Sequence, residues 1–152
     1  MVNSTPPHSD RKVWISLLAK ASSSHLSELW ATYDEPPEHS VLRAPEVGSV
    51  MVRGRTGATG AAFNLGEMTV TRCSVQLASG ETGHGYIQGR DKKKALQAAM
   101  IDALLQTAAA PQVQRKIVDP LQARHEEKRA RRSAKAAATK VDFFTMVRGE
   151  DT

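Results

Sequence analysis

Two stripes of apolar side chains, each at the spacing of one helix face, open the chain. The first comprises Trp14, Leu17, Leu18 and Ala21, and the second Leu26, Leu29, Trp30 and Tyr33. Apolar residues at i, i+3, i+4 and i+7 line one side of a helix, so we predict two helices. Ser9 or Asp10 caps the first, and the sequence DEPPE ends the second. Together they should form a helical hairpin that buries both tryptophans.

The period changes to two in the middle of the chain. Residues 63–77, FNLGEMTVTRCSVQL, alternate between the two faces of a strand, with Cys73 on the inward face as a small buried hydrophobe rather than a nucleophile. Residues 41–55 are rich in β-branched side chains, which favours a strand before it. The turn signal ASGE and the segment TGHGYIQG then predict a returning strand. These segments indicate an antiparallel meander.

Helical patterns return after residue 90. Asp91 is placed to cap a third helix that covers the sheet. Its apolar face comprises Leu96, Ala99, Met100, Ala103 and Leu104. Pro111 and Pro120 interrupt the segment after this helix, and residues 121–139 have high helix propensity but little apolar surface beyond Leu121. We therefore expect that last helix to reach outward as an arm.

This order of elements predicts an α+β fold: an N-terminal helical hairpin, an antiparallel β-sheet covered by helices, and a C-terminal helical arm with an apolar tail. We expect residues 1–114 to form the α+β core and residues 115–152 the arm and tail, as one structural unit.

Charge and composition limit the class of protein. The net charge of +5 arises late, because residues 115–140 carry nine Lys and Arg against three Asp and Glu. A small nucleic-acid-binding protein is therefore an alternative, but this basic segment has no aromatic side chain on which bases could stack. The chain has no long apolar run, no signal-peptide pattern and one cysteine. We expect a cytoplasmic protein that binds neither a membrane nor nucleic acid.

Two cationic segments could hold an anion. RGRTGATGAAF lacks the Walker lysine, so it is either a tight turn or a backbone nest flanked by arginines. GRDKKK lies at the start of the third helix, where backbone N–H groups favour anions and where a solvated cationic surface is the alternative. The candidate phosphate or anion contacts are Arg53, Arg55, Thr56, Gly57, Thr59, Gly60, Arg90 and Lys92. His84 stands alone in its segment, and the spacing of residues predicts neither a catalytic set nor a metal site.

The tail VDFFTMVRGE places apolar side chains beyond the arm. The residues we expect to dock on a partner are Phe143, Phe144, Met146 and Val147. The alternative is that this tail folds back as an edge strand on the sheet of its own chain.

Four motifs occur in a fixed order: LRAPEVGSVMVRGRTGATGAAFNLGEMTVTR, GHGYIQGRDK, AMIDALL and VDFFTMVRG. With them the chain resembles the PhnG subunit family of the bacterial carbon-phosphorus lyase system, from about Arg11 to Gly149. The resemblance implies a subunit that joins PhnH, PhnI and PhnJ in a two-fold symmetric core complex of phosphonate catabolism. It also implies a supporting role in the displacement of adenine from MgATP by an alkylphosphonate, together with the ATPase-like PhnL and PhnK.

The resemblance implies no catalytic residue in this chain. In such a complex the nucleosidase activity belongs to PhnI, and radical carbon-phosphorus cleavage with an iron-sulfur cluster and S-adenosylmethionine belongs to PhnJ. We therefore expect a non-catalytic but required subunit that binds no cofactor by itself and whose tail docks on the PhnI-like partner.

Overall fold

The computed structural model describes residues 8–33 and 36–139 and has an α+β fold, as predicted. The elements, in chain order, are α1 (His8–Lys20), α2 (Ser23–Ala31), β1 (His39–Arg55), the 3-10 turn η1 (Thr56–Ala58), β2 (Ala62–Leu77), β3 (Thr82–Gln88), α3 (Lys92–Leu104), α4 (Ala110–Val113), the π-helical turn η2 (Gln114–Val118) and α5 (Asp119–Ala138). Among the helices of these residues, none has both the length and the apolar character needed to cross a bilayer.

Helices α1 and α2 pack against α3 through their apolar stripes. Helix α1 begins at His8, so Ser9 and Asp10 lie within its first turn and the predicted cap at these residues is wrong. Trp14 is buried as predicted, but Trp30 is only half-buried, because it lies at the edge of the core and stacks on Tyr33 with 5.6 Å between ring centroids. Helix boundaries are set by local backbone hydrogen bonds, which a stripe of side chains does not fix.

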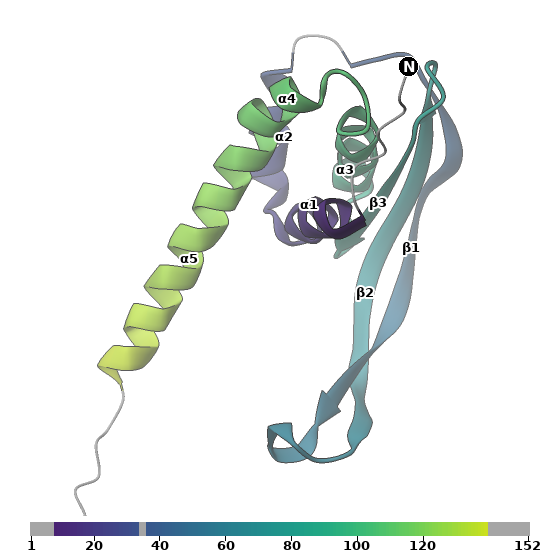
Figure 1. The fold of residues 1–152 in the computed structure, drawn as a ribbon. Coiled ribbons are helices and arrows are strands. Elements are labelled where there is room, and N and C mark those ends of the chain that lie inside the picture. The colour runs from purple at the N-terminus through teal and green to yellow at the C-terminus, as the bar shows by residue number, and fades with distance from the viewer. Residues whose placement is uncertain (1–7, 34–35, 140–152) are drawn as a thin grey trace, which may run out of the picture.

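Within the described residues the sheet has three antiparallel strands in the order β1-β2-β3, the meander that the alternation predicts. The helices cover one face of this sheet, as Figure 1 shows. Strand β3 pairs with residues 70–76 of β2, whereas β1 pairs with β2 along residues 62–77. Residues 49–55 and 62–69 therefore continue past β3 as a two-stranded extension, which we call the ribbon.

Glycines let α3 approach β3 closely. A Cβ at Gly83 would lie 1.9 Å from the carbonyl oxygen of Ala99, and one at Gly85 would lie 2.0 Å from that of Ala95. Helix α3 is consequently buried on almost all sides, between the sheet and the other helices. The predicted single apolar face was therefore too narrow, and Leu96, which we placed on that face, is only partly buried.

A buried carboxylate joins α1, β3 and α3. Asp102 is fully buried and accepts hydrogen bonds from Arg11 Nε (3.1 Å), Arg11 Nη2 (2.7 Å), Trp14 Nε1 (2.8 Å) and the backbone N–H of His84 (2.8 Å). The arginine compensates the charge, and the four donors satisfy the oxygen atoms. These contacts fix α1 against the base of the sheet.

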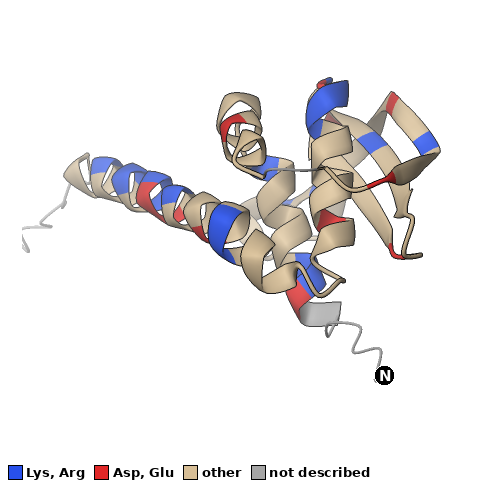
Figure 2. Ribbon diagram, turned by 90° about the horizontal axis from the view of Figure 1, so that it is seen from above, with Lys and Arg blue, Asp and Glu red and all other residues tan. Residues whose placement is uncertain are grey.

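Helices α4 and α5 are joined through η2, so the chain is helical from Ala110 to Ala138. Pro120 does not interrupt it, contrary to our prediction, because proline fits the first turn of α5 directly after the π-helical turn. Ile117, Val118 and Leu121 belong to the core, and every residue from 122 to 139 is exposed. Residues 122–138, which we call the arm, project away from the body as predicted (Figure 1). Figure 2 shows Lys and Arg recurring along the arm.

Candidate functional site

The ribbon and the arm are the two parts of the described chain that extend away from the body. Figure 1 shows them diverging on the same side of the molecule. An isolated two-stranded ribbon is only marginally stable in water, and a helix without an apolar face has little to hold it against its own domain. Both elements therefore expose surface to which another molecule could bind.

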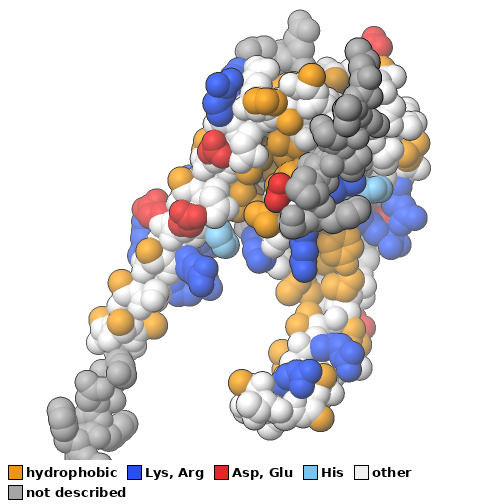
Figure 3. All heavy atoms as spheres, in the orientation of Figure 1, with side chains coloured by type: hydrophobic (Ala, Val, Ile, Leu, Met, Phe, Trp, Pro, Cys, Tyr) orange, Lys and Arg blue, Asp and Glu red, His pale blue; other side chains and the backbone are white. Residues whose placement is uncertain are grey.

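Large apolar side chains lie exposed along the ribbon and its base. Phe63 is 44% exposed and Leu65 is 66% exposed, and Val47, Met51 and Met68 are also exposed. Val47 and Met51 pair with Thr71 and Glu67, so they continue the face of the sheet that carries the core. Met68 occupies the other face of β2. Figure 3 shows hydrophobic side chains along this ribbon and Lys or Arg toward its tip. Contiguous exposed apolar surface usually marks a contact site.

The sequence pattern did not point to these ribbon residues as a site. Their strand pattern was visible, but the pattern could not reveal that β3 ends level with Val70 and that the ribbon extends past the helices (Figure 1). One signal was available: the predicted returning strand is much shorter than the two strands before it.

The ribbon ends in a tight turn, one of the two alternatives for this segment. Gly57 and Ala58 have positive φ values of 58° and 66°, a conformation that glycine adopts without strain. The backbone N–H of Gly60 donates to the carbonyl of Thr56 (2.9 Å), Arg55 Nη1 donates to the carbonyl of Gly60 (3.2 Å), and Thr59 Oγ1 lies 3.5 Å from the carbonyl of Gly57. The loop therefore engages its own polar groups.

Of the residues predicted to hold an anion at the tip, the structure brings Arg53 and Arg55 together. They line an open depression of about 530 Å³ with Gly54, Ala58 and Ala62, and this lining does not include Thr56, Gly57, Thr59 or Gly60. Two exposed arginines beside one depression could receive an anionic group of a partner.

Arg90 and Lys92 lie elsewhere, at the N-terminus of α3. Strand β3 ends opposite Val70, whereas Arg53 pairs with Asn64, so about six residues of strand, or roughly 20 Å, separate the two cationic positions. Asp91 caps α3 by accepting from the backbone N–H of Lys94 (2.9 Å), as predicted. This hydrogen bond, followed by one from Ser23, lowers the pKa of Asp91. The predicted anion contacts thus lie at two separate places, one for each of the two cationic segments.

His84 has a partner that the sequence did not suggest. Its Nδ1 lies 2.9 Å from Ser74 Oγ on the sheet face opposite the helices, where β2 and β3 place these residues directly opposite each other. A serine beside an imidazole is the beginning of a nucleophile and base pair. Here the two side chains belong to an exposed row of the sheet that also contains Arg43, and they do not line the depression beside Arg53.

Two buried groups also titrate away from their ordinary values. Burial raises the pKa of the Cys73 thiol, in keeping with its predicted inward position. Burial lowers the pKa of the Lys94 ammonium group, which donates to the carbonyl of Ala19 (3.1 Å) and so links α3 to α1. In residues 8–33 and 36–139, no three His, Cys, Asp or Glu side chains are grouped as a metal site would require.

The predicted docking residues Phe143, Phe144, Met146 and Val147 lie outside the described residues. Their role stays a prediction.

Comparison with known proteins extends over nearly the whole chain. Residues 9–149 match the family model of PhnG, described as a phosphonate metabolism protein. A relative from Rhizobium meliloti (strain 1021) is named alpha-D-ribose 1-methylphosphonate 5-triphosphate synthase subunit PhnG. The two are 47% identical over 141 residues, which cover 93% of this chain and 90% of the relative.

Proposed function

Because the chain belongs to the PhnG family of phosphonate metabolism proteins, we propose that it is a required, non-catalytic subunit of an alpha-D-ribose 1-methylphosphonate 5-triphosphate synthase. The assembly transfers the ribose 5-triphosphate group of MgATP to an alkylphosphonate and releases adenine. The partners are PhnI-, PhnH- and PhnJ-like subunits in a two-fold symmetric complex, with PhnK- and PhnL-like ATPases. The PhnJ-like subunit holds the iron-sulfur cluster and uses S-adenosylmethionine, and this chain binds neither.

The observation that carries the proposal is the uncovered ribbon. Its two strands extend past β3 and past the helical layer, with Phe63, Leu65 and Met51 exposed. A strand pair of this kind gains stability when a further strand or an apolar surface covers it. A partner subunit supplies that surface in an assembly.

The exposed side chains of the ribbon would contribute measurably to such an interface. Full burial of a large apolar side chain contributes about 1.5–3 kcal/mol. Phe63 and Leu65 expose about half of their surface, so covering them contributes about 1 kcal/mol each. Replacing both should then weaken assembly by roughly 30-fold.

Co-purification with the partner subunits tests the proposal. Phe63→Ser with Leu65→Ser should remain folded but co-purify with the PhnI-, PhnH- and PhnJ-like subunits in much smaller amounts. Val13→Ser is the matched control, because Val13 is 62% exposed on α1, outside the ribbon. If the ribbon variant assembles as well as the Val13 variant, the ribbon is not the interface. If the unmodified chain does not co-purify, the assignment as a subunit is wrong.

The non-catalytic role has a separate test. The purified chain is incubated with MgATP and an alkylphosphonate, and free adenine is measured against the assembled complex. We expect release only from the complex. Release by the chain alone at a comparable rate would place the catalytic groups in this subunit, with Ser74 and His84 as the first pair to replace.

A further inference from the structure

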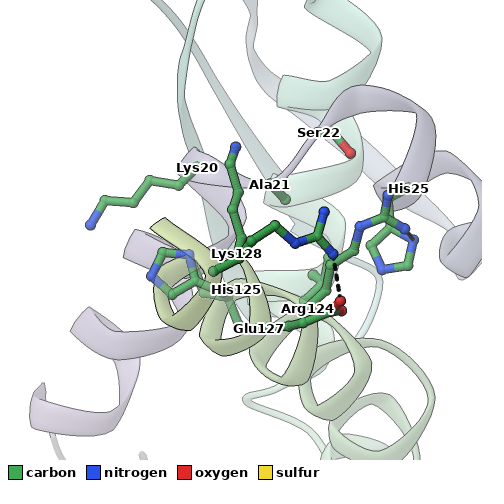
Figure 4. A pocket seen from close by; sticks show the side chains of 11 residues that line it. Lys20, Ala21, Ser22, His25, Arg124, His125, Glu127 and Lys128 are labelled. Atoms are coloured by element: carbon green, nitrogen blue, oxygen red, sulfur yellow. Dashed lines mark hydrogen bonds and ion pairs between the residues drawn. The ribbon is translucent and has the colours of Figure 1, made fainter. Parts of the chain in front are cut away.

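A cavity of about 500 Å³ lies where the end of α1 and the start of α2 face α5. Ligand pockets of small molecules have this size. Figure 4 shows the site, with His25 and Arg124 side by side and His125 toward the opposite end. Its lining comprises Leu17, Lys20, Ala21, Ser22, His25, Leu121, Arg124, His125, Glu127, Lys128 and Arg131.

The lining is strongly cationic. The lining contains two lysines, two arginines and two histidines, and its one carboxylate is that of Glu127. The carboxylate is held by Arg131 Nη2 at 2.7 Å, and both side chains are mostly exposed. The cavity thus has a surplus of positive charge that the described chain does not neutralise, and such a surplus concentrates anions.

These cations lie on the face of α5 that is turned toward the body. Leu121 is buried against the body, and Arg124, His125 and Lys128 follow it at i+3, i+4 and i+7. These are the positions that apolar side chains occupy when a helix packs on its own domain. Charge therefore replaces the apolar stripe where α5 faces the end of α1.

An unsatisfied polar atom lies at the same place. His25 Nδ1 is 3.4 Å from Arg124 Nη1 and 3.7 Å from Glu28 Oε2. His25 Nε2 is buried and has no hydrogen-bond partner among the described residues. A buried polar atom without a partner is unfavourable, and a bound ligand or water would relieve it. Ser22, the N-cap of α2, also lines the cavity, and its side chain makes no capping hydrogen bond. Because the N-terminus of α2 lies at the cavity, its partial positive charge adds to the electrostatic potential there.

We propose that this cavity binds the phosphate chain of a triphosphate ligand. From Arg124 to Arg131 the helix rises by about 10 Å, a length suited to several linked phosphates rather than to one. Guanidinium groups bind phosphate oxygens through paired hydrogen bonds. The proposal rests on the proposed function, because the triphosphate of that reaction is the ligand class it names. It assigns this chain a part in holding the triphosphate that the assembled enzyme transfers.

Calorimetric titration of the full chain tests the site without partners. The probes are inorganic tripolyphosphate, MgATP, adenosine and a tetraglutamate peptide, at fixed ionic strength. We expect tripolyphosphate and MgATP to bind with similar affinity and adenosine not to bind. Arg124→Gln with Lys128→Gln should weaken both by about tenfold or more, because hydrogen bonds between charged groups are lost.

Arg129→Gln with Arg132→Gln is the matched control, because it removes the same charge from α5 outside the cavity lining. It should change the affinity less than about twofold. If both double variants weaken binding equally, the attraction is that of a basic helix and the site is refuted. Tighter binding of the tetraglutamate peptide would assign the cavity to an acidic segment of a protein and overturn the proposal.

Failure of this site and failure of the subunit assignment are distinguishable. The Arg124 and Lys128 double variant should still co-purify with the partner subunits, because the ribbon is unchanged. Loss of tripolyphosphate binding with normal assembly supports both proposals. If the unmodified chain binds no tripolyphosphate but assembles, the cavity proposal alone is wrong.

Discussion

Replacing Asp102 by asparagine tests whether the buried carboxylate organises the fold. The change keeps the shape of the side chain and replaces one oxygen by an NH2 group. Oδ1 accepts from Arg11 Nε and Trp14 Nε1, and Oδ2 accepts from Arg11 Nη2 and the backbone N–H of His84. Each oxygen therefore faces two donors, so either orientation of the amide directs its own N–H groups against donors.

The expected cost depends on this geometry. Asp102 is fully buried and the Arg11 side chain is 24% exposed, so the variant leaves a mostly buried cation without its counter-charge. Removing one partner of such a pair costs about 3–5 kcal/mol. A domain of this size has about 5–15 kcal/mol of stability. The variant should thus lose a large part of its free energy of unfolding.

Urea unfolding followed by circular dichroism measures the loss. Glu46→Gln is the control, because the same chemical change is made on the exposed face of the sheet. Glu46 Oε1 accepts from Arg72 Nε (2.6 Å) and Arg43 Nη1 (3.1 Å), and these side chains are about half exposed. The control should lose less than about 1 kcal/mol. If the Asp102 variant loses no more than the Glu46 variant, the network does not contribute as we infer.

Three further outcomes are expected. Gly85→Ala should lower the free energy of unfolding by about 2–3 kcal/mol, because its Cβ would lie 2.0 Å from the Ala95 carbonyl oxygen; Gly48→Ala, which meets nothing within 4 Å, is the neutral control, and equal urea midpoints would contradict the close packing. Asp91→Ala should lower the free energy of unfolding by about 1 kcal/mol at neutral pH. The hydrogen bond from the α3 backbone lowers the folded-state pKa of Asp91, so this stabilisation is present above the usual carboxyl pKa and is lost as the pH falls through the folded-state pKa. A stability difference between the variant and the unmodified chain that grew on acidification would be inconsistent with this cap. Deleting residues 141–152 should leave a folded chain that no longer assembles; unfolding of the truncated chain would support the fold-back alternative, and full co-purification would exclude docking by the tail.

The sequence by itself determined most of the helices and strands and their order, but not the helical segment 110–118 that precedes α5. Periodicity located both N-terminal helices, alternation located β2, and Asp91 marked the start of α3. The projection of the arm was also predictable from the sequence, since residues beyond Leu121 offer no apolar face and therefore cannot pack on the body. These features depend on neighbours within one or two turns, which a linear pattern records.

The tertiary structure decided which distant groups meet. Arg11 binds Asp102 across 91 positions of the chain, and the end of α1 shares a cavity with Arg124 and Lys128. These contacts depend on how closely α3 approaches β3 and on the angle at which α5 leaves the body. Two glycines allow the close approach of α3 to β3, and α5 leaves the body directly after a π-helical turn. Periodicity gives the face on which a side chain lies, but the partner opposite that face is fixed only when the layers are packed.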